Sequence, residues 1–372
     1  MSKLKNLLRY PLVWLFGAFL LGATLADLLT PAKSFSDFEN RYLKQRPSPT
    51  LKTIFDGSFS QNYESYLNDQ FLFRNGWITL KSYSESALLK VENNGIVYGK
   101  GGQLFEKYRS FSQSQLDKNL AHLRSFLEGR PQAVLAVVPS AYEIYPEKLP
   151  LGLNQVDQLT QIAKINQALS DVALPLDLPA VLTAAKDQEL YYRTDHHWTT
   201  DGAYLAYTAY CAARNLTPVD RADLPLHRVP DFYGTYFNKC KNTSIRPDTL
   251  TWYDVPLASV TVDGQEKDKY LNCAALETRD KYSAFLWGNN GVTVLKSRET
   301  ANPSRLLVIK DSFANCLAPF LTANYDEVWV VDLRSLPTGM TALMEETAFD
   351  DILILYNFEN LAADTNFYRI NR

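Results

Sequence analysis

The sequence predicts an α/β protein whose mostly parallel β-sheet is covered by helices on both faces. Four apolar runs have the length of buried strands, at residues 133–138, 306–309, 328–331 and 352–355. They are continuous rather than alternating with polar residues, which is typical of parallel strands buried on both sides. Helical patterns lie between the strands, as expected for a fold that alternates strand and helix.

Residues 1–30 are expected to form an N-terminal transmembrane anchor. Three basic residues precede an apolar run from Pro11 to about Leu29, and Asp27 near its end is the first acidic residue. About 19 residues at 1.5 Å each span about 28 Å, just enough for the hydrocarbon core of a bilayer. Basic residues before the run and acidic ones after it place the N-terminus in the cytoplasm.

A cleaved signal peptide is the alternative for this segment. Ala23 and Ala26 are small residues near its end, but their spacing does not match an A-x-A cleavage site. Either alternative places everything after residue 30 outside the cytoplasm. The expected location is the cell membrane, with a single membrane pass and the rest of the chain outside the cytoplasm.

Residues 31–90 are expected to be an extracytoplasmic tether followed by a helical segment. The part up to residue 60 is polar and contains three prolines, whereas residues 63–91 place apolar side chains at helical intervals. Apolar residues then alternate around glycines at 95–105, which predicts a hairpin.

Residues 91–372 are expected to form the main α/β domain, which also holds the candidate catalytic residues described below. After the first buried strand, the pattern predicts a helix at 159–172, a weaker strand at 174–178 and a helix at 201–215. Residues 216–300 are less regular and rich in turns, so they are expected to be a partly β-structured or irregular insertion.

Composition narrows the classes of partner. The net charge is −3 and no basic run occurs outside the N-terminus, so the sequence gives no case for nucleic-acid binding. The chain contains 22 Tyr, 19 Phe and 6 Trp. Such side chains line sugar-binding clefts, but they also fill cores and interfaces.

Four cysteines are present, and outside the cytosol a disulfide is possible. Cys240 and Cys273 are the expected pair because both lie in one polar, loop-rich stretch. Cys211 and Cys316 lie in apolar helical contexts and are expected to be buried. No C-x-x-C spacing occurs, which argues against a zinc site built on thiolates.

Residues 193–200 read Arg-Thr-Asp-His-His-Trp-Thr-Thr and hold two of the chain's four histidines. If this segment is extended, Asp195 and His197 share one face and His196 turns to the other. An aspartate that orients a histidine forms the general-base part of a nucleophilic triad. The alternatives are a structural histidine pair and a metal site, which needs further ligands from other elements.

Ser312 is the candidate nucleophile. It follows the strand at 306–309 and precedes a predicted helix through Phe320, and in α/β sheets sites form beyond the carboxyl ends of the strands. Its backbone N–H, near a helix N-terminus, could help form an oxyanion site. A helix N-cap is the alternative role for a serine at this position.

Three further residues are substrate or oxyanion candidates: Asn315, Ser140 and Arg334. Asn315 lies one turn after Ser312, and it could equally be a surface residue. Ser140 follows the first buried strand. Arg334 follows the third, where structural pairing with Asp332 is the alternative.

The chain also resembles a known family of bacterial proteins, named DHHW after the string Asp195-His196-His197-Trp198. Further motifs fall in the family's order after the membrane segment: Glu39-Asn40-Arg41, Asp69-Gln70-Phe71 with Arg74, Val138-Pro139-Ser140, Gly234-Thr235-Tyr236 and Asp311-Ser312-Phe313. That family is similar to the alginate O-acetyltransferase proteins of the periplasm.

The resemblance implies an SGNH-hydrolase-like domain, a flavodoxin-like three-layer α/β/α fold with circularly permuted motif order. It implies Ser312 as nucleophile, His197 as base and Asp195 as its orienting acid. The chain departs from the family in having Lys310 where a glycine usually precedes Asp-Ser. It also departs in that no carbohydrate-binding module is expected after the catalytic domain.

The expected function is therefore a membrane-anchored O-acetyltransferase acting on a cell-surface polysaccharide or exopolysaccharide. The resemblance also implies a membrane-bound O-acyltransferase as a partner that delivers acetyl groups. No cofactor or metal is expected. The alternatives are a polysaccharide acetyl esterase, a non-catalytic cell-surface or sporulation-related scaffold, and a metal hydrolase.

Overall fold

The computed structural model describes residues 10–372 apart from residues 37, 39–40, 131 and 299–300. The chain forms two compact units. The N-terminal unit comprises Met1–Lys90 with Lys241–Thr243, and the C-terminal unit comprises Val91–Cys240 with Ser244–Arg372.

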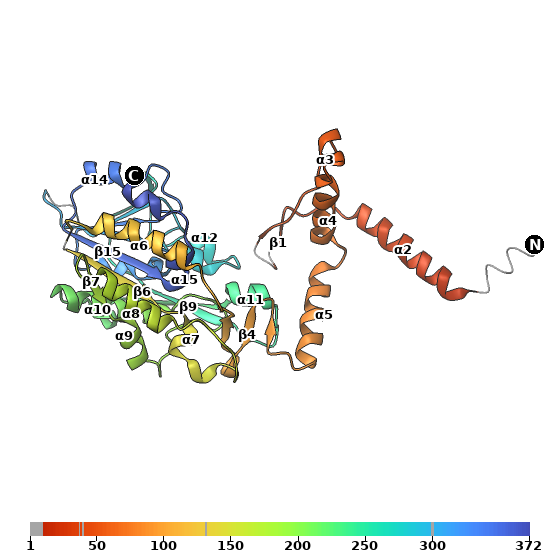
Figure 1. Cartoon of the computed structure of the whole chain (residues 1–372), viewed down its shortest axis with the longest axis horizontal. Coiled ribbons are helices and arrows are strands. Elements are labelled where there is room, and N and C mark those ends of the chain that lie inside the picture. Colours follow the sequence, from red (N-terminus) through yellow and green to blue (C-terminus); the bar gives the residue numbers. More distant parts are fainter. Residues whose placement is uncertain (1–9, 37, 39–40, 131, 299–300) are drawn as a thin grey trace, which may run out of the picture. The chain divides into compact units, whose positions relative to one another are not determined.

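The N-terminal unit is built from helices and one short hairpin (Figure 1). Its elements are α2 (Pro11–Leu29), β1 (Phe35–Ser36), β2 (Arg41–Tyr42), α3 (Leu51–Phe55), α4 (Ser58–Gln70) and α5 (Arg74–Ala87). The helical pattern at 63–91 thus covers two helices. The break between them lies at Phe73, whose φ of 56° is left-handed.

The predicted transmembrane helix is not supported. Within the described part of the chain, no helix is long and apolar enough to cross a membrane. The 19 residues of α2 extend for about 28 Å, against a hydrocarbon thickness of about 30 Å. Asp27 adds a carboxylate near its C-terminal end. Residues 1–9 of the predicted anchor lie outside the described residues.

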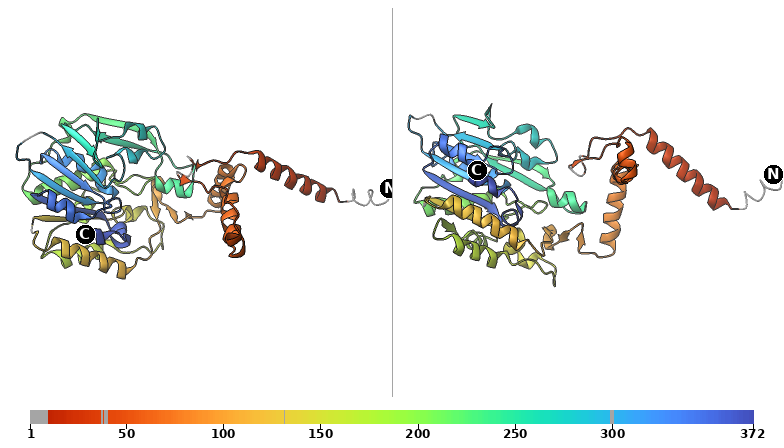
Figure 2. Two further views of the ribbon diagram at one scale, coloured as in Figure 1. Left: turned by 90° about the horizontal axis from the view of Figure 1, so that it is seen from above. Right: turned by 45° about the horizontal axis from the view of Figure 1, so that its top comes forward.

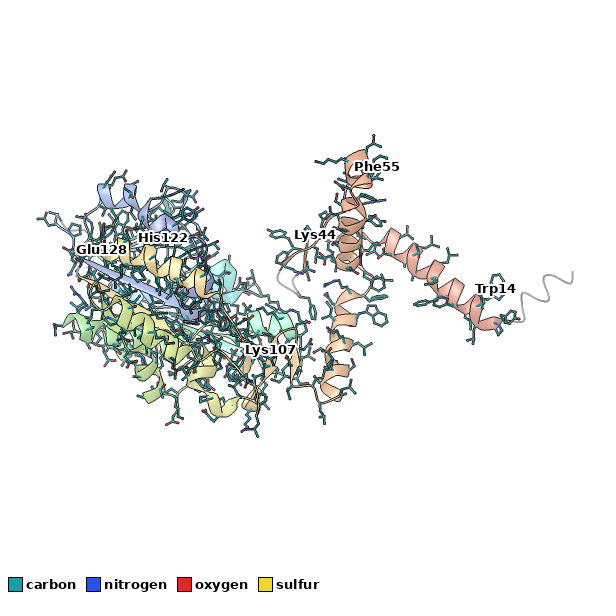
Figure 3. The ribbon with its side chains drawn as sticks, in the orientation of Figure 1. Trp14, Lys44, Phe55, Lys107, His122 and Glu128 are labelled. Carbon is teal, nitrogen blue, oxygen red and sulfur yellow. The ribbon has the colours of Figure 1, made fainter. Side chains whose placement is uncertain are left out.

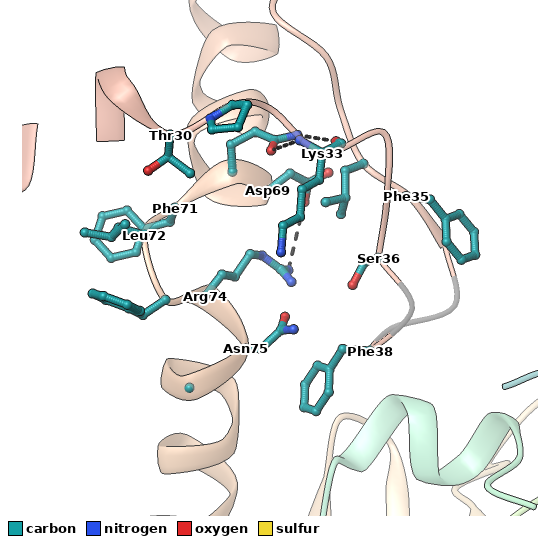
Figure 4. Close-up of a pocket in the computed structure, with 15 residues that line it drawn as sticks. Thr30, Lys33, Phe35, Ser36, Phe38, Asp69, Phe71, Leu72, Arg74 and Asn75 are labelled. Carbon is teal, nitrogen blue, oxygen red and sulfur yellow. Dashed lines mark hydrogen bonds and ion pairs between the residues drawn. The ribbon is translucent and has the colours of Figure 1, made fainter. Parts of the chain in front are cut away.

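The motif residues of the N-terminal unit form a hydrogen-bonded cluster beside a pocket of about 600 Å³ (Figure 4). Asp69 accepts from the Arg41 guanidinium and from the backbone N–H of Lys44. These bonds, the Arg41 contact above all, hold the pKa of Asp69 below its usual value. The Gln70 amide bonds both the N–H and the C=O of Lys33. Glu39 and Asn40 lie outside the described residues.

An eight-stranded sheet forms the centre of the C-terminal unit, in the order β11-β10-β12-β14-β13-β15-β6-β7. The five strands from β14 to β7 are parallel, and β12, β10 and β11 continue the sheet in antiparallel pairing. Their bounds are β6 (Ala133–Val138), β7 (Leu174–Leu176), β10 (Ser259–Val262), β11 (Gln265–Lys267), β12 (Val292–Lys296), β13 (Arg305–Lys310), β14 (Glu327–Val331) and β15 (Asp351–Asn357). The predicted α/β class and its parallel strands are confirmed.

Helices cover both faces of this sheet (Figures 1 and 2). Alternate residues of the parallel strands face two separate cores. One core includes residues of α9 (Leu178–Ala184), α10 (Thr200–Arg214) and α13 (Ala318–Leu321). The other includes residues of α6 (Gln113–Leu127), α8 (Gln158–Leu169), α14 (Met340–Glu346) and α15 (Phe358–Ala363). Two-sided burial explains why the strands read as continuous apolar runs.

The predicted hairpin at 95–105 is present as two strands of a three-stranded meander. Residues 216–300 form a two-stranded ribbon and also supply the strands β10, β11 and β12 of the main sheet. The remaining elements are β3 (Glu92–Asn93), β4 (Ile96–Tyr98), η1 (Lys100–Gly102), β5 (Leu104–Glu106), α7 (Ala141–Ile144), η2 (Pro146–Lys148), η3 (Arg221–Asp223), β8 (Leu226–Phe232), α11 (Thr235–Cys240), β9 (Asp248–Tyr253), α12 (Cys273–Leu276), η4 (Lys281–Ala284), η5 (Ser312–Cys316) and η6 (Phe367–Asn371).

The predicted disulfide between Cys240 and Cys273 is wrong. Both side chains are thiols, and they lie in different environments: Cys240 is buried and Cys273 is exposed. Cys240 directs its sulfur toward the carbonyl oxygen of Phe237. Cys211 and Cys316 are buried, as expected from their apolar surroundings.

Candidate active site

The loop that carries the histidine motif is closed by an isolated antiparallel bridge between Tyr191 and Trp198. Residues 193–197 bend within this loop instead of forming an extended strand. The expectation that His196 turns away from its neighbours is therefore wrong. The His196 ring lies 3.8 Å from the His197 ring, and its Nδ1 lies 3.5 Å from Asp195 Oδ1.

Ser312 stands at the carboxyl end of β13, as the sequence predicted. The helix N-cap role falls to Asp311, whose carboxylate accepts from the backbone N–H of Phe313 at 3.0 Å. The Ser312 hydroxyl instead lies 2.7 Å from Nε2 of His197. The alternative reading of Ser312 as a capping residue is thus replaced by a contact with an imidazole.

Asp195, His197 and Ser312 form a continuous chain of hydrogen bonds. Asp195 Oδ1 lies 2.5 Å from Nδ1 of His197, which contacts Ser312 through its other nitrogen. Asp195 Oδ1 also accepts from the His197 backbone N–H at 3.0 Å, and its Oδ2 accepts from Thr235 N–H at 2.6 Å. The side chains of Asp195, His197 and Ser312 are all buried.

The environment of Asp195 favours its ionised form. Burial alone would raise the pKa of this carboxyl, but the nearby imidazoles and the donors to its oxygens outweigh burial and hold the pKa well below its ordinary value. Gly234 lies directly against this side chain, because an added Cβ there would overlap both Cβ and Oδ2 of Asp195. A carboxylate held in this way can fix the tautomer of a neighbouring imidazole.

Two rings enclose the His197 imidazole. Tyr282 stacks on one face, with ring centroids 3.7 Å apart, and donates its hydroxyl to the Ser312 carbonyl oxygen at 3.0 Å. His196 lies against the imidazole at 3.8 Å. Burial, followed by the neighbouring His197, lowers the pKa of His196 to about 4, so this ring is neutral near neutral pH.

The contact of Tyr282 with His197 could not be predicted from the sequence. Tyr282 is one of 22 tyrosines, and no local motif marks it. Trp198 is fully buried and donates its indole N–H to the Phe313 carbonyl oxygen at 2.8 Å. Gly234 and Thr235 belong to a motif that the sequence did highlight, although their contact with Asp195 could not be read from it.

Asp311 joins the Ser312 turn to the neighbouring strand. Its Oδ2 accepts from the Asn357 backbone N–H at 2.8 Å and from the Asn360 amide at 2.7 Å. The side chain is fully buried, and burial raises its pKa. These bonds fix the position of the turn that carries Ser312.

Arg334 is engaged with Asp332, as the structural alternative expected. Its Nε lies 2.9 Å from Asp332 Oδ1, and its Nη2 lies 2.6 Å from Oδ2. The buried ammonium of Lys310 binds the same carboxylate at 3.1 Å and the Asn289 amide oxygen at 2.9 Å. Lys310, the residue that differs from the usual family glycine, therefore adds a buried charge, and the Asp332 carboxylate compensates it.

The other two candidates also have partners. Asn315 is buried, and its amide donates to Asn289 Oδ1 at 3.1 Å. Its own Oδ1 is buried without a hydrogen-bond partner among the described residues. Ser140 donates to Glu359 at 2.7 Å and accepts from Gln158 at 3.0 Å. Among the residues that the structure describes, neither of these two side chains contacts Ser312 or His197 by a hydrogen bond.

Asp195, His196 and His197 could in principle hold a metal, because one ligand atom of each lies within 4.8 Å of the others. A metal there would compete with the contacts that Asp195 and His197 already make. The remaining histidines lie elsewhere. His122 is on α6 (Figure 3), and His227 pairs with Asp254.

The fold, together with the hydrogen bonds that link Asp195 to His197 and His197 to Ser312, defines the class of the protein. It is an α/β protein with a linked aspartate, histidine and serine at the carboxyl edge of its sheet. The chain belongs to the DHHW family, because the family model described as DHHW protein matches residues 84–331, more than half of its length.

Comparisons with individual proteins agree with this assignment. A protein named probable alginate O-acetylase AlgJ, from Pseudomonas syringae pv. tomato, is 27% identical over 234 residues. The match covers 59% of this chain and 56% of that protein. The chain thus spans about half the length of the curated relatives that it matches.

Two solved structures share the fold. A DHHW family protein from Eubacterium siraeum has a TM-score of 0.66 at 22% identity, covering 76% of this chain and 97% of that one. PatB1 from Bacillus cereus, in a structure with a sulfonyl adduct, has a TM-score of 0.60 at 20% identity and covers 74% and 99%.

Proposed function

We propose that this protein is an SGNH-like O-acetyltransferase that modifies a polysaccharide outside the cytoplasm through an acetyl–serine intermediate. The observation that carries the proposal is the hydrogen-bonded chain from Asp195 through His197 to Ser312. The matched part of a probable alginate O-acetylase supports acetyl transfer to a polysaccharide.

The first half of the reaction forms the acetyl-enzyme. His197 Nε2 takes the hydroxyl proton of Ser312 as Oγ attacks the carbonyl carbon of an acetyl ester or thioester. The bond from that carbon to the donor's oxygen or sulfur breaks, and His197 returns the proton to this leaving atom. Asp195 holds the imidazole tautomer and stabilises the imidazolium.

The second half transfers the acetyl group. A sugar hydroxyl gives its proton to His197 and attacks the acetyl carbon, and the Ser312 oxygen leaves and recovers a proton from His197. With water as the acceptor, the same steps describe the esterase alternative. The two reactions differ only in which hydroxyl reaches the acetyl-enzyme.

Reaction with an electrophile tests the nucleophile directly. We expect a sulfonyl fluoride to add one sulfonyl group to the wild-type protein at Ser312, and none to Ser312→Ala, as read by mass spectrometry. PatB1, which shares the fold, has been captured with a sulfonyl adduct. Ser140→Ala is the matched control, since Ser140 is also a buried serine beyond a parallel strand but bonds Glu359 instead of a histidine.

Turnover then tests the activity. We expect a chromogenic acetyl ester to be cleaved by the wild type and not by Ser312→Ala, and an added polysaccharide to become acetylated. Acetate release without transfer to any glycan would favour the esterase. Absence of both labelling and cleavage would favour the non-catalytic scaffold.

A further inference from the structure

A second pocket lies in the C-terminal unit, and its lining includes neither Ser312 nor His197. It has a volume of about 690 Å³ and is formed by β8, β9, the β10–β11 hairpin and the segment leading to α12. These elements all fall within residues 216–300, the segment that follows the histidine motif. A pocket of this size can hold a small ligand or one or two units of a polymer.

One part of the pocket is a rigid aromatic surface. The His227 ring stacks on Trp252, with centroids 5.1 Å apart and planes inclined by 13°. His227 Nε2 lies 2.6 Å from Asp254 Oδ2, which fixes the orientation of the ring. The His227 side chain is 43% exposed, so this fixed ring remains accessible to a ligand. Flat faces of this kind suit the C–H surface of a sugar ring.

Charged side chains of both signs surround the aromatic surface. Glu266, Lys267, Asp268 and Lys269 follow one another along the chain and line the pocket with Asp254. Glu266, Asp268 and Lys269 are exposed, and no ion pair engages them among the residues the structure describes. Acidic and basic groups therefore alternate, and the pocket has no strong net charge. It offers acceptors and donors to hydroxyl groups and does not favour a polyanion.

We propose that this pocket binds a neutral sugar segment of a glycan, apart from the Ser312 site. The inference rests on the proposed function for its expectation of a polysaccharide. Binding here can nevertheless be measured without catalysis, so the two proposals can fail separately.

Cys273 provides the measurement, because it lines the pocket and is exposed, whereas the other three cysteines are buried. In the full-length protein, alkylation by a maleimide should label Cys273 first. The probe ligands are neutral oligosaccharides of glucose, galactose, mannose or N-acetylglucosamine, with an oligomannuronate as the polyanionic comparison. At about ten times the dissociation constant, occupancy alone should slow labelling about tenfold.

Two variants test whether the slower labelling of Cys273 comes from a sugar bound in this pocket. Trp252→Ala should abolish the protection of Cys273 because the aromatic surface is lost. Glu266→Gln combined with Asp268→Asn keeps the shape of two exposed side chains and should reduce the protection several-fold, even if Trp252→Ala folds poorly. Cys273→Ser confirms which thiol reacts.

The outcomes separate the alternatives. Protection by a neutral oligosaccharide that these variants weaken supports the pocket, and it should be the same in Ser312→Ala. Protection by none of the neutral sugars, equal protection by the oligomannuronate, or protection unchanged in both variants would overturn it. If the protein neither cleaves an acetyl ester nor acetylates a polysaccharide, but a neutral oligosaccharide still protects Cys273 from the maleimide, only the proposed function is contradicted.

Discussion

The imidazole of His197 lies flat on the phenol ring of Tyr282, with centroids 3.7 Å apart and planes inclined by 10°. The tyrosine hydroxyl reaches past the imidazole to the carbonyl oxygen of Ser312 at 3.0 Å. One side chain thus touches both the proposed base and the backbone of the proposed nucleophile. It fixes their relative position, and its π face can stabilise an imidazolium.

Substitutions of Tyr282 should separate these two contacts. Tyr282→Phe keeps the stacked ring and loses the hydrogen bonds of the hydroxyl to the Ser312 carbonyl oxygen and to Cys316 Sγ, so we expect kcat to fall by less than about tenfold. Tyr282→Leu also loses the aromatic face, and kcat should fall further while KM stays near its wild-type value. Steady-state kinetics with an acetyl ester measures both. Equal losses in the two variants would show that the stacking contributes nothing.

The two adjacent histidines should differ in importance. His197→Ala removes the only imidazole within hydrogen-bond distance of Ser312 among the described residues, and activity should disappear. His196→Ala removes a neutral neighbouring ring, so its effect should be milder. Comparing kcat/KM for the two variants tests the assignment. Equal sensitivity would contradict the role given to His197.

Asp195→Asn tests control of the imidazole tautomer. The amide keeps the size of the side chain but can present N–H to the ring, which favours the wrong tautomer. We expect kcat to fall by roughly 10⁴, as for the corresponding change in serine proteases. Thermal unfolding of the variant is the control. A large loss of stability would explain the lower kcat without any change in the imidazole tautomer.

Gly234→Ala should act through Asp195. The new methyl group would overlap the Asp195 side chain, so either this side chain or the start of α11 must move. We expect activity to approach that of Asp195→Asn. Gly76→Ala is the matched control, because nothing lies within 4 Å of a Cβ at that position and its φ is not left-handed. Unchanged activity in Gly234→Ala would show that the loop adapts.

The sequence predicted those parts of the molecule that depend on local pattern. Continuous apolar runs gave the parallel strands, because burial on both faces removes any alternation. Ser312 was found for a related reason, since a polar residue directly after such a strand lies at the edge where sites form. The link from Ser312 to His197 relied on chemical complementarity, and the structure brings the two atoms to 2.7 Å.

Features set by tertiary geometry could not be predicted in this way. The bend of the histidine loop turns His196 toward its neighbours, and it depends on the bridge between Tyr191 and Trp198. Tyr282 reaches His197 across a long stretch of chain. The prediction of a disulfide failed for the same reason. Cys240 and Cys273 lie in one polar stretch of the sequence, but this says nothing about the distance between their sulfur atoms.

The raised pKa of Glu359 predicts that the stability of the protein depends on pH. Burial is the main cause that raises its pKa from 4.5 to about 7, although Ser140 and Gln158 donate to its carboxylate. Between these two values the folded protein binds more protons than the unfolded chain, so the free energy of unfolding falls as the pH rises through this window. Over the whole window the loss is about 3 kcal/mol, because each unit of pKa difference corresponds to about 1.4 kcal/mol.

Glu359→Gln should remove this dependence, because the amide stays neutral and resembles the protonated acid. Denaturant unfolding at several pH values from about 4.5 to about 7 measures the difference between wild type and variant, which should grow with pH in favour of the variant. Glu147→Gln, at an exposed position, is the matched control for loss of one carboxyl group. A difference that stays constant with pH would show that Glu359 is ionised throughout the window and that its neighbours compensate for burial.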